Sequence, residues 1–231
     1  MLAVIGDIHS NLEALTAVLD DIKAHHVEKI ICVGDVIGFG PDPCACLDLV
    51  MECCQMTILG NHDEAAFIEP AGFSPVALQA VDWTRKQLEK ASEGRQRRWE
   101  YLGTIPRKFE EGDVLFVHGS PREPTHEYIF PEDIYNHRKM DQVFSRFSKY
   151  CVMGHTHLPG ILTVDYRFIS PEECGYRYLL GGERTMINVG SVGQPRDGDL
   201  RACYVLLDDD KVIFRRIEYD AETTMKKLRG I

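Results

Sequence analysis

The feature that most constrains the fold is a short apolar run that ends in polar residues, because it occurs five times along the chain. Apolar runs of this length, bounded by glycine and small polar residues, are typical of buried strands. The pattern therefore predicts five buried strands, each with polar side chains at its carboxyl end. The polar ends are Asp7-Ile8-His9, Gly34-Asp35, Gly60-Asn61-His62-Asp63, His118-Gly119 and Gly154-His155-Thr156-His157.

The first sixty residues alternate between strand and helix patterns. Asn11 is a helix cap, and the apolar residues that follow it keep helical spacing as far as Ile22. Pro43 begins a second helix that ends near Cys54. A β-α-β-α-β order implies a parallel sheet with right-handed crossovers. The strands are predicted at residues 2–5, 29–33 and 55–59.

Residues 64–104 differ from the rest of the chain because they contain helix patterns but no strand pattern. Helices are predicted at residues 75–90, after a capping Ser74, and at residues 95–102. The block is too short to bury a stable core of its own. We therefore interpret residues 1–231 as a single domain with a helical insertion or cap at about residues 64–104.

Strand patterns resume after this block, and some of them are spaced like hairpins, with Asp208-Asp209-Asp210 as one turn. An α/β opening followed by such strands predicts an α/β fold with two mixed β-sheets packed face to face and helices on the outer faces. The strands are predicted at residues 114–117, 150–153, 161–164, 185–189, 202–207 and 211–217. The helices are predicted around residues 131–147 and at residues 221–228.

The charge balance is acidic, with 26 Lys and Arg against 36 Asp and Glu, a net charge of −10. This balance excludes bulk binding to nucleic acid or to an anionic membrane, which requires a basic surface. No segment is apolar enough to span a bilayer, and the first residues, MLAVIGD, have no basic region typical of a signal peptide. We therefore expect a cytoplasmic protein. The acidic balance is still compatible with a small anionic substrate, because a bound metal inverts the local electric field.

The polar strand ends offer carboxylate, imidazole and amide groups but no thiolate. In α/β folds ligands bind at the carboxyl ends of strands, where loops bring such groups together. The mixture suits divalent cations such as Mn, Fe or Zn. Seven side chains are candidate ligands, more than the four that a single tetrahedral zinc takes, so two metals that share one carboxylate fit better. The candidates are Asp7, His9, Asp35, Asn61, His118, His155 and His157.

Each of these motifs alone is also typical of a simpler role. Asp7 alone is more often a turn residue or a helix cap, and His118 alone is more often a hydrogen-bonded polar residue. A single Gly-Asp or Asn-His-Asp sequence is common in turns. The metal site is favoured because all five motifs follow strand-like runs in one domain.

The motifs D-x-H, G-D, G-N-H-D, H-G and G-H-T-H, in this order, resemble those of the calcineurin-like metallophosphoesterase family. The resemblance extends from Leu2 to about Tyr219. The segments GNHDEAA and GSVGQPRDG, the latter at residues 190–198, look like the prokaryotic phosphodiesterase branch. The resemblance implies a four-layer α-β-β-α sandwich and two divalent metal ions, which are Mn, Fe, Zn or Ni.

Carried over by position, the family pattern also implies a role for each ligand. One metal would be held by Asp7, His9 and His157, the other by Asn61, His118 and His155, and Asp35 would bridge them. The implied nucleophile is a hydroxide that bridges the metals. His62 would not bind metal, since it resembles the general acid of the family.

Two arginines in the loops are candidates for binding substrate phosphate, because a guanidinium matches phosphate with two hydrogen bonds. They are Arg122 and Arg196, and each is equally compatible with a solvated loop charge. Where the protein Ser/Thr phosphatase branch carries Asp-Arg, this chain has Gly38-Phe39-Gly40. This departure argues against a phosphoprotein substrate.

The sequence therefore predicts a two-metal phosphoesterase that acts on small phosphate mono- or diesters. A nucleotide-polyphosphate hydrolase, for example one that splits a dinucleoside polyphosphate, is the alternative within the enzymes, and the helical block could then line its pocket. The alternative that is not an enzyme is a non-catalytic metal-binding scaffold on the same fold. The P-loop motif of nucleotide-triphosphate hydrolases is absent.

Overall fold

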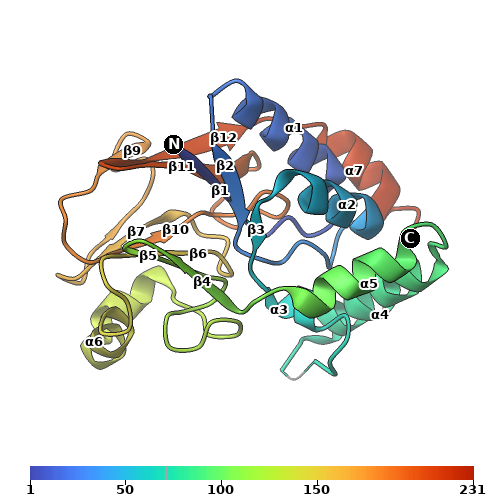
Figure 1. Cartoon of the computed structure of the whole chain (residues 1–231), viewed down its shortest axis with the longest axis horizontal. Helices are drawn as coiled ribbons and strands as arrows, with labels where there is room; N and C mark the ends of the chain where they lie inside the picture. The colour runs from blue at the N-terminus through green and yellow to red at the C-terminus, as the bar shows by residue number, and fades with distance from the viewer. Residues whose placement is uncertain (71) are drawn as a thin grey trace.

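The computed structural model describes residues 1–70 and 72–231; position 71, inside the predicted helical block, lies outside the described residues. Two six-stranded mixed sheets face each other, and helices cover their outer sides (Figure 1). This arrangement confirms the predicted fold class. Each helix among the described residues is too short or too polar to cross a membrane.

The first sheet contains the strands of the predicted β-α-β-α-β opening. Its strand order is β3-β2-β1-β11-β12-β9, with β1, β2 and β3 parallel and β11 antiparallel to β1. This pairing confirms the predicted parallel arrangement of β1, β2 and β3. The strands are β1 (Leu2–Ile5), β2 (Lys29–Cys32), β3 (Met56–Thr57), β9 (Arg177–Leu179), β11 (Ala202–Asp208) and β12 (Lys211–Ile217).

The second sheet has the order β4-β5-β6-β10-β7-β8, and its three central strands β5, β6 and β10 are parallel. The neighbours β4 and β7 run antiparallel to this centre. The strands are β4 (Lys108–Glu111), β5 (Val114–Val117), β6 (Tyr150–Met153), β7 (Gly160–Thr163), β8 (Phe168–Ile169) and β10 (Thr185–Asn188).

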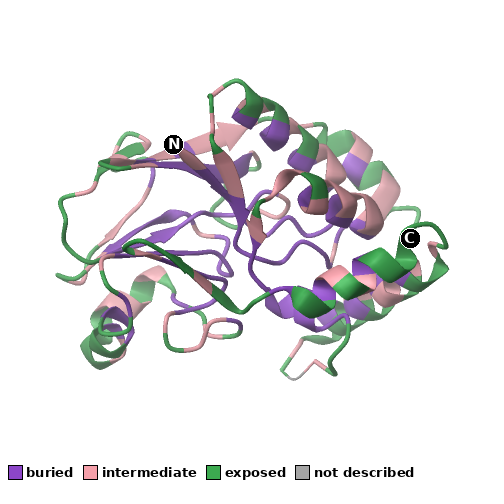
Figure 2. Cartoon of the chain, viewed as in Figure 1, coloured by how far each residue is buried: buried purple, intermediate pink, exposed green. Residues whose placement is uncertain are grey.

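Alternate residues of the strands point into different layers, as expected for pleated strands. Val4 of β1 and Phe116 of β5 belong to the core between the two sheets, whereas Ala3 and Leu115, their neighbours in sequence, contact the outer helices. The outer helices are α1 (Leu12–Lys23) and α2 (Pro43–Cys53) on the first sheet, with α7 (Ala221–Leu228) packed against α1, and η1 (Pro131–Tyr135) and α6 (His137–Phe144) on the second sheet. Figure 2 shows buried residues in both sheets and on the inner sides of the helices.

Three local predictions differ from the structure. The helix predicted around residues 131–147 is divided at Asn136, whose side chain caps α6 by accepting from the backbone N–H of Lys139. The strand predicted at residues 55–59 is shorter, because the Leu59 N–H donates to the Pro106 carbonyl outside the sheet. Strands β4, β8 and β9 were not predicted, since they are short and none of their residues is buried.

The helical block contains α4 (Pro75–Lys90) and α5 (Arg95–Thr104), after the short α3 (Asn61–Glu64). Both longer helices pack against α2, and their Leu88 and Leu102 join the core beneath the first sheet. The buried Arg98 of α5 donates from Nε and Nη2 to the Asp48 carboxylate of α2, at 2.9 and 2.5 Å. Its Nη1 donates to the Glu93 carbonyl. The block therefore shares the core of the main body.

We expect Arg98→Ala to lower the free energy of unfolding by about 2 kcal/mol, because it removes charged hydrogen bonds at a buried position. Arg97→Ala is the matched control, since Arg97 is its exposed neighbour on α5. Urea unfolding followed by circular dichroism measures both. If the block belongs to a single domain, each variant keeps one transition; a separate early transition would contradict that interpretation.

Asp63 connects the loops after β2 and β3. Its carboxylate is fully buried, and Oδ1 accepts from the backbone N–H groups of Val36 and Ile37 at 2.9 and 3.1 Å. Oδ2 accepts from the Gly60 N–H at 3.1 Å. One side chain thus holds the loop that carries Asp35 against the beginning of α3.

Asp63→Ala should destabilise the protein by about 3 kcal/mol, because three buried N–H groups lose their acceptor. Asp82→Ala is the control, because it removes a carboxylate from the exposed side of α4. Its free energy of unfolding should stay within about 0.5 kcal/mol of that of the parent. Thermal and urea unfolding measure the difference. Equal stability of the two variants would contradict the anchoring role of Asp63.

Candidate metal centre

The loops after β1, β2, β3, β5 and β6 bring all seven candidate ligands into one buried region, together with His62. Three groups of potential ligand atoms form there, and the atoms within each group lie within 4.8 Å of one another. The groups share members, so they form one continuous cluster. They are Asp7, His9 and His157; His9, Asp35 and His62; and Asp35, His118 and His155.

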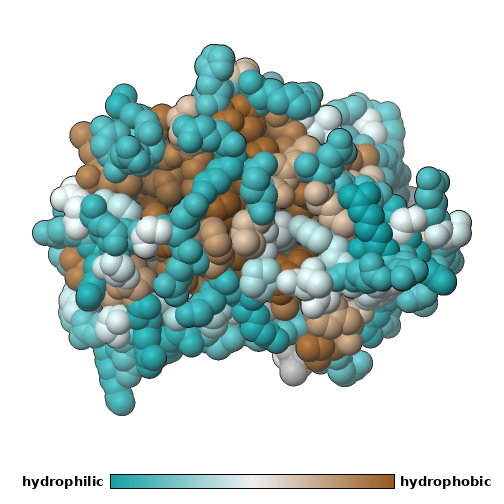
Figure 3. All heavy atoms as spheres, viewed as in Figure 1, coloured by the Kyte–Doolittle hydropathy of each residue, from teal (hydrophilic) through white to brown (hydrophobic). Residues whose placement is uncertain are grey.

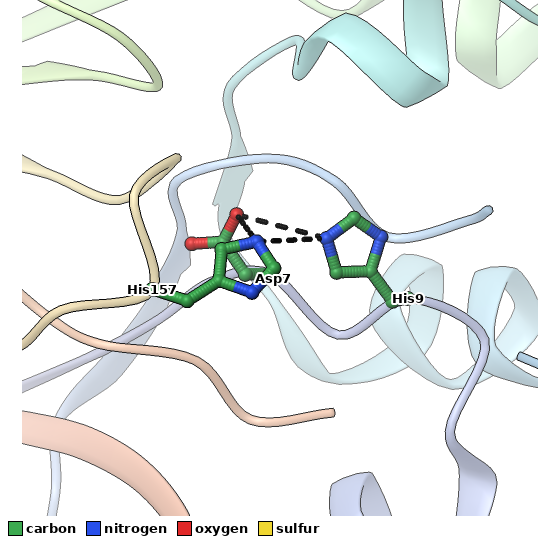
Figure 4. A group of neighbouring side chains, drawn as sticks. All are labelled: Asp7, His9 and His157. Carbon is green, nitrogen blue, oxygen red and sulfur yellow. Dashed lines mark hydrogen bonds and ion pairs between the residues drawn. The ribbon is translucent and has the colours of Figure 1, made fainter. Parts of the chain in front are cut away.

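The first group joins β1 to β6. The Nε2 atoms of His9 and His157 lie 3.1 Å apart, and Oδ1 of Asp7 lies 3.2 Å from His157 Nε2 and 3.9 Å from His9 Nε2. Figure 4 shows the two imidazoles and the carboxylate turned toward one common point. Residues 148 positions apart in sequence are therefore neighbours here.

The third group is built around His118. Its Nε2 lies 3.1 Å from Oδ1 of Asn61 and 3.4 Å from Oδ2 of Asp35. The same Oδ2 lies 3.6 Å from His9 Nε2 in the first group. Asp35 is thus the carboxylate that contacts both groups.

Backbone carbonyls fix the orientation of the imidazoles. Nδ1 of His118 lies 2.9 Å from the Val33 carbonyl, and Nδ1 of His157 lies 2.6 Å from the Gln194 carbonyl. A carbonyl only accepts hydrogen bonds, so these Nδ1 atoms carry the proton and the Nε2 atom of a neutral ring is an acceptor. Such carbonyl contacts are typical of metal-binding histidines.

The ligand atoms of the cluster therefore suit a cation. Acceptor nitrogens converge on carboxylate oxygens and on an amide oxygen, and these acceptors repel one another unless a positive charge lies between them. The same carboxylates favour the protonated form of the imidazole that faces them. Burial acts to lower the pKa of His118, but the Asp35 carboxylate and then Asp7 outweigh it and raise the pKa to about 9. Burial and the charge at His118 lower the pKa of His155 to about 3.

The backbone is strained at several of these positions. Five of the seven candidates have a positive φ, a region that residues other than glycine rarely occupy. Strain of this kind persists only where the surroundings enforce it, and it is typical of functional sites. The five are Asp7 (50°), His9 (47°), Asp35 (52°), His155 (71°) and His157 (61°).

Two glycines let the backbone approach the carboxylates closely. A Cβ atom on Gly60 would overlap with Oδ1 of Asp35, and a Cβ atom on Gly154 would overlap with Oδ2 of Asp7. Backbone N–H groups close to these glycines donate to the same two carboxylates. His62 N donates to Asp35 at 2.8 Å, and His155 N donates to Asp7 at 3.0 Å.

His62 lies at the edge of the cluster. Its ring packs between Phe39 and Phe73, with centroids 4.6 and 4.9 Å away, and meets the His9 ring edge-on at 5.0 Å. Burial lowers the pKa of His62, and the Asp35 carboxylate opposes that shift. Its Nδ1 has no hydrogen-bond partner among the described residues.

The two candidate phosphate-binding arginines have different surroundings. Arg122 forms an ion pair with Glu127 through Nε and Nη2, and its Nη1 donates to Gln142. Arg196 donates from Nη2 to the Gln194 side chain at 2.8 Å, two residues from the carbonyl that orients His157. The guanidinium of Arg122 is therefore the more occupied of the two. Substrate binding by either residue stays a prediction.

Several supporting residues carried no signal in the sequence. Tyr128 stacks on the ring of His155 at a centroid distance of 3.7 Å. Arg85 of α4 donates to the carbonyls of Ala65 and Ile68 at 2.7 and 2.8 Å and so caps the carboxyl end of α3. These contacts depend on residues distant in sequence, so no local pattern reports them.

A family model described as the calcineurin-like phosphoesterase superfamily domain matches residues 1–211. An uncharacterized protein of Methanocaldococcus jannaschii is 35% identical over 237 residues, which cover 99% of this chain and 91% of the relative. The crystal structure of a metallophosphoesterase from Sphaerobacter thermophilus has a TM-score of 0.81 at 35% identity, covering 99% of this chain and 93% of that chain. A hypothetical protein from Pyrococcus horikoshii shares the fold, with a TM-score of 0.76 at 22% identity and coverage of 100% and 93%. The chain therefore belongs to the calcineurin-like phosphoesterase superfamily and is a metal-dependent phosphoesterase.

Proposed function

We propose that the protein holds two divalent metal ions and hydrolyses small phosphate mono- or diesters. The observation that carries the proposal is the position of Asp35. Its Oδ2 lies 3.6 Å from His9 Nε2 and 3.4 Å from His118 Nε2, so one carboxylate joins two groups of acceptor atoms. Seven acceptor side chains, one of which is the shared carboxylate of Asp35, exceed what a single ion takes.

The proposed ligands divide along these groups, with Asp35 shared between them. The first ion is assigned to Asp7, His9 and His157, and the second to Asn61, His118 and His155. Divalent ions held there would polarise the phosphate ester and activate the attacking water. The buried carboxylates keep the site negative, so cations bind and the phosphate of the substrate then meets positive charge.

In this proposal His62 donates a proton to the leaving oxygen of the ester. Its backbone N–H is held by Asp35, and its ring lies between Phe39 and Phe73. The position lets the ring face a phosphate bound at the cluster while the aromatic side chains keep water from its faces. A phosphate dianion beside the imidazole raises the pKa of His62 and so favours the protonated form. Arg196, on the loop beside His157, is proposed to contact the phosphate.

We expect the purified protein with added Mn to hydrolyse p-nitrophenyl phosphate or its bis ester. Release of p-nitrophenolate measures the rate. Removal of metal with a chelator should abolish turnover, and added Mn should restore it, because the chain itself supplies no nucleophile in this proposal. Absence of turnover with Mn, Fe, Zn and Ni would favour a metal-binding scaffold instead.

Two variants distinguish a metal ligand from a general acid. Asp35→Ala should lose both metals, because the shared carboxylate contributes to both groups. His62→Ala should keep two metals per chain while turnover falls on the order of 100-fold or more, as for loss of a general acid. Elemental analysis after gel filtration and steady-state kinetics measure the two properties, with the exposed His26→Ala as control. Loss of metal from His62→Ala would make His62 a ligand and overturn its assignment.

A further inference from the structure

A pocket of about 290 Å³ opens beside the metal centre, between α3, the chain that follows α3 and the loop before η1. Its apolar wall contains Ile68 and Phe73, and its polar residues are Asn61, Glu64, Glu69 and His126. Ile68 and its neighbour Phe67 are exposed, at 47% and 44%. Figure 3 shows apolar atoms on the near face where the chain between α3 and α4 lies.

The pocket shares its walls with the cluster. Asn61 also contacts His118 through Oδ1, and the His126 carbonyl accepts from His155 Nε2 at 3.2 Å. The Phe73 ring packs on His62, the proposed proton donor, at 4.9 Å. A group that receives a proton from His62 lies next to that ring. The pocket is thus placed where the leaving group of a phosphate ester extends away from the reacting phosphate.

The charges in the pocket select the kind of leaving group. Glu64 is the buried acid, and both of its oxygens are occupied, one by Arg107 and the other by His126 Nε2 at 2.7 Å. Glu69 is 89% exposed at the rim. No lysine or arginine is among the described lining residues. A leaving group that carries its own phosphate or carboxylate would therefore meet two acids, and the arginines nearest them, Arg107 and Arg85, are already paired with those acids.

We propose that this pocket binds an uncharged aromatic leaving group of the phosphate ester substrate. The inference rests on the proposed function and narrows its substrate class. The volume of the pocket is close to about 300 Å³, which is the lower end of the range for small-molecule sites, and it suits a single ring system. Apolar contact with Phe73 and Ile68 favours a flat ring, and the acidic rim disfavours the charged leaving groups of nucleotide polyphosphates.

Binding of two hydrolysis-resistant phosphonates tests the apolar wall. With Mn present, calorimetry should find phenylphosphonate bound roughly tenfold more tightly than methylphosphonate, because the ring is removed from water. Phe73→Ala and Ile68→Ala should each reduce that ratio severalfold. Val76→Ala, an exposed apolar residue of α4 outside the pocket, should leave it unchanged. The ratio cancels any effect that a variant has on phosphonate binding as a whole.

Reversal of the rim charge tests the selection against anions. The substrates are phenyl phosphate and 4-(carboxymethyl)phenyl phosphate, which have leaving groups of similar reactivity but different charge. Glu69→Lys should raise kcat/KM for the charged ester relative to the neutral one by about threefold or more, as expected for an exposed charge. Glu52→Lys, an exposed residue of α2, makes the same change of charge elsewhere and should leave the ratio unchanged.

The possible failures are distinguishable. If the parent protein hydrolyses phenyl phosphate but binds the two phosphonates equally, or if Glu69→Lys and Glu52→Lys act alike, the leaving-group pocket is overturned and the phosphoesterase stands. If no ester is hydrolysed with any metal and neither phosphonate binds, the proposed function fails and the pocket proposal falls with it.

Discussion

The rest of the structure depends on the buried carboxylate of Asp35. A buried carboxylate is costly unless other groups compensate its charge. Its Oδ1 accepts the His62 N–H, and its Oδ2 faces nitrogens of His9 and His118, which come from the two different sheets. Burial opposes ionisation of Asp35, but His118 and then His62 outweigh it and hold its pKa well below the usual range. The two sheets therefore meet at a point that attracts positive charge.

The loops around this point are strained, and identifiable contacts hold them. Positive φ at a residue such as Asp7 or His9 costs on the order of 1 kcal/mol or more. Asp63 offsets that cost for the Asp35 loop with three backbone hydrogen bonds. Ser191 and Gly193 do the same for Asp7, because both donate to its carbonyl, at 2.8 and 2.9 Å. Contacts within the chain thus help to hold the site residues in position, which is what a preorganised catalytic centre requires.

The helical block is more than a cover over the core. Arg85 of α4 caps α3, the helix that carries Asn61 and His62, and Phe73 precedes α4 and packs on His62. Arg98 holds the same block on α2. A change in this block would therefore alter the position of the proposed acid and the shape of the pocket beside it.

The sequence by itself determined the strands that end in the site and the residues that gather there. Apolar runs such as residues 2–5 and 150–153 are local, and polar residues at their ends need no long-range contact to be recognised. Only the tertiary structure decided how those residues are oriented. The carbonyls of Val33 and Gln194 that orient His118 and His157 are 85 and 37 positions away from their partners. A backbone carbonyl is the same in every residue, so no side-chain pattern could report these contacts. The break at Asn136 and the charged strand β4 were missed for other reasons, because a side-chain cap at Asn136 begins α6 and because β4 is short and has no buried residue.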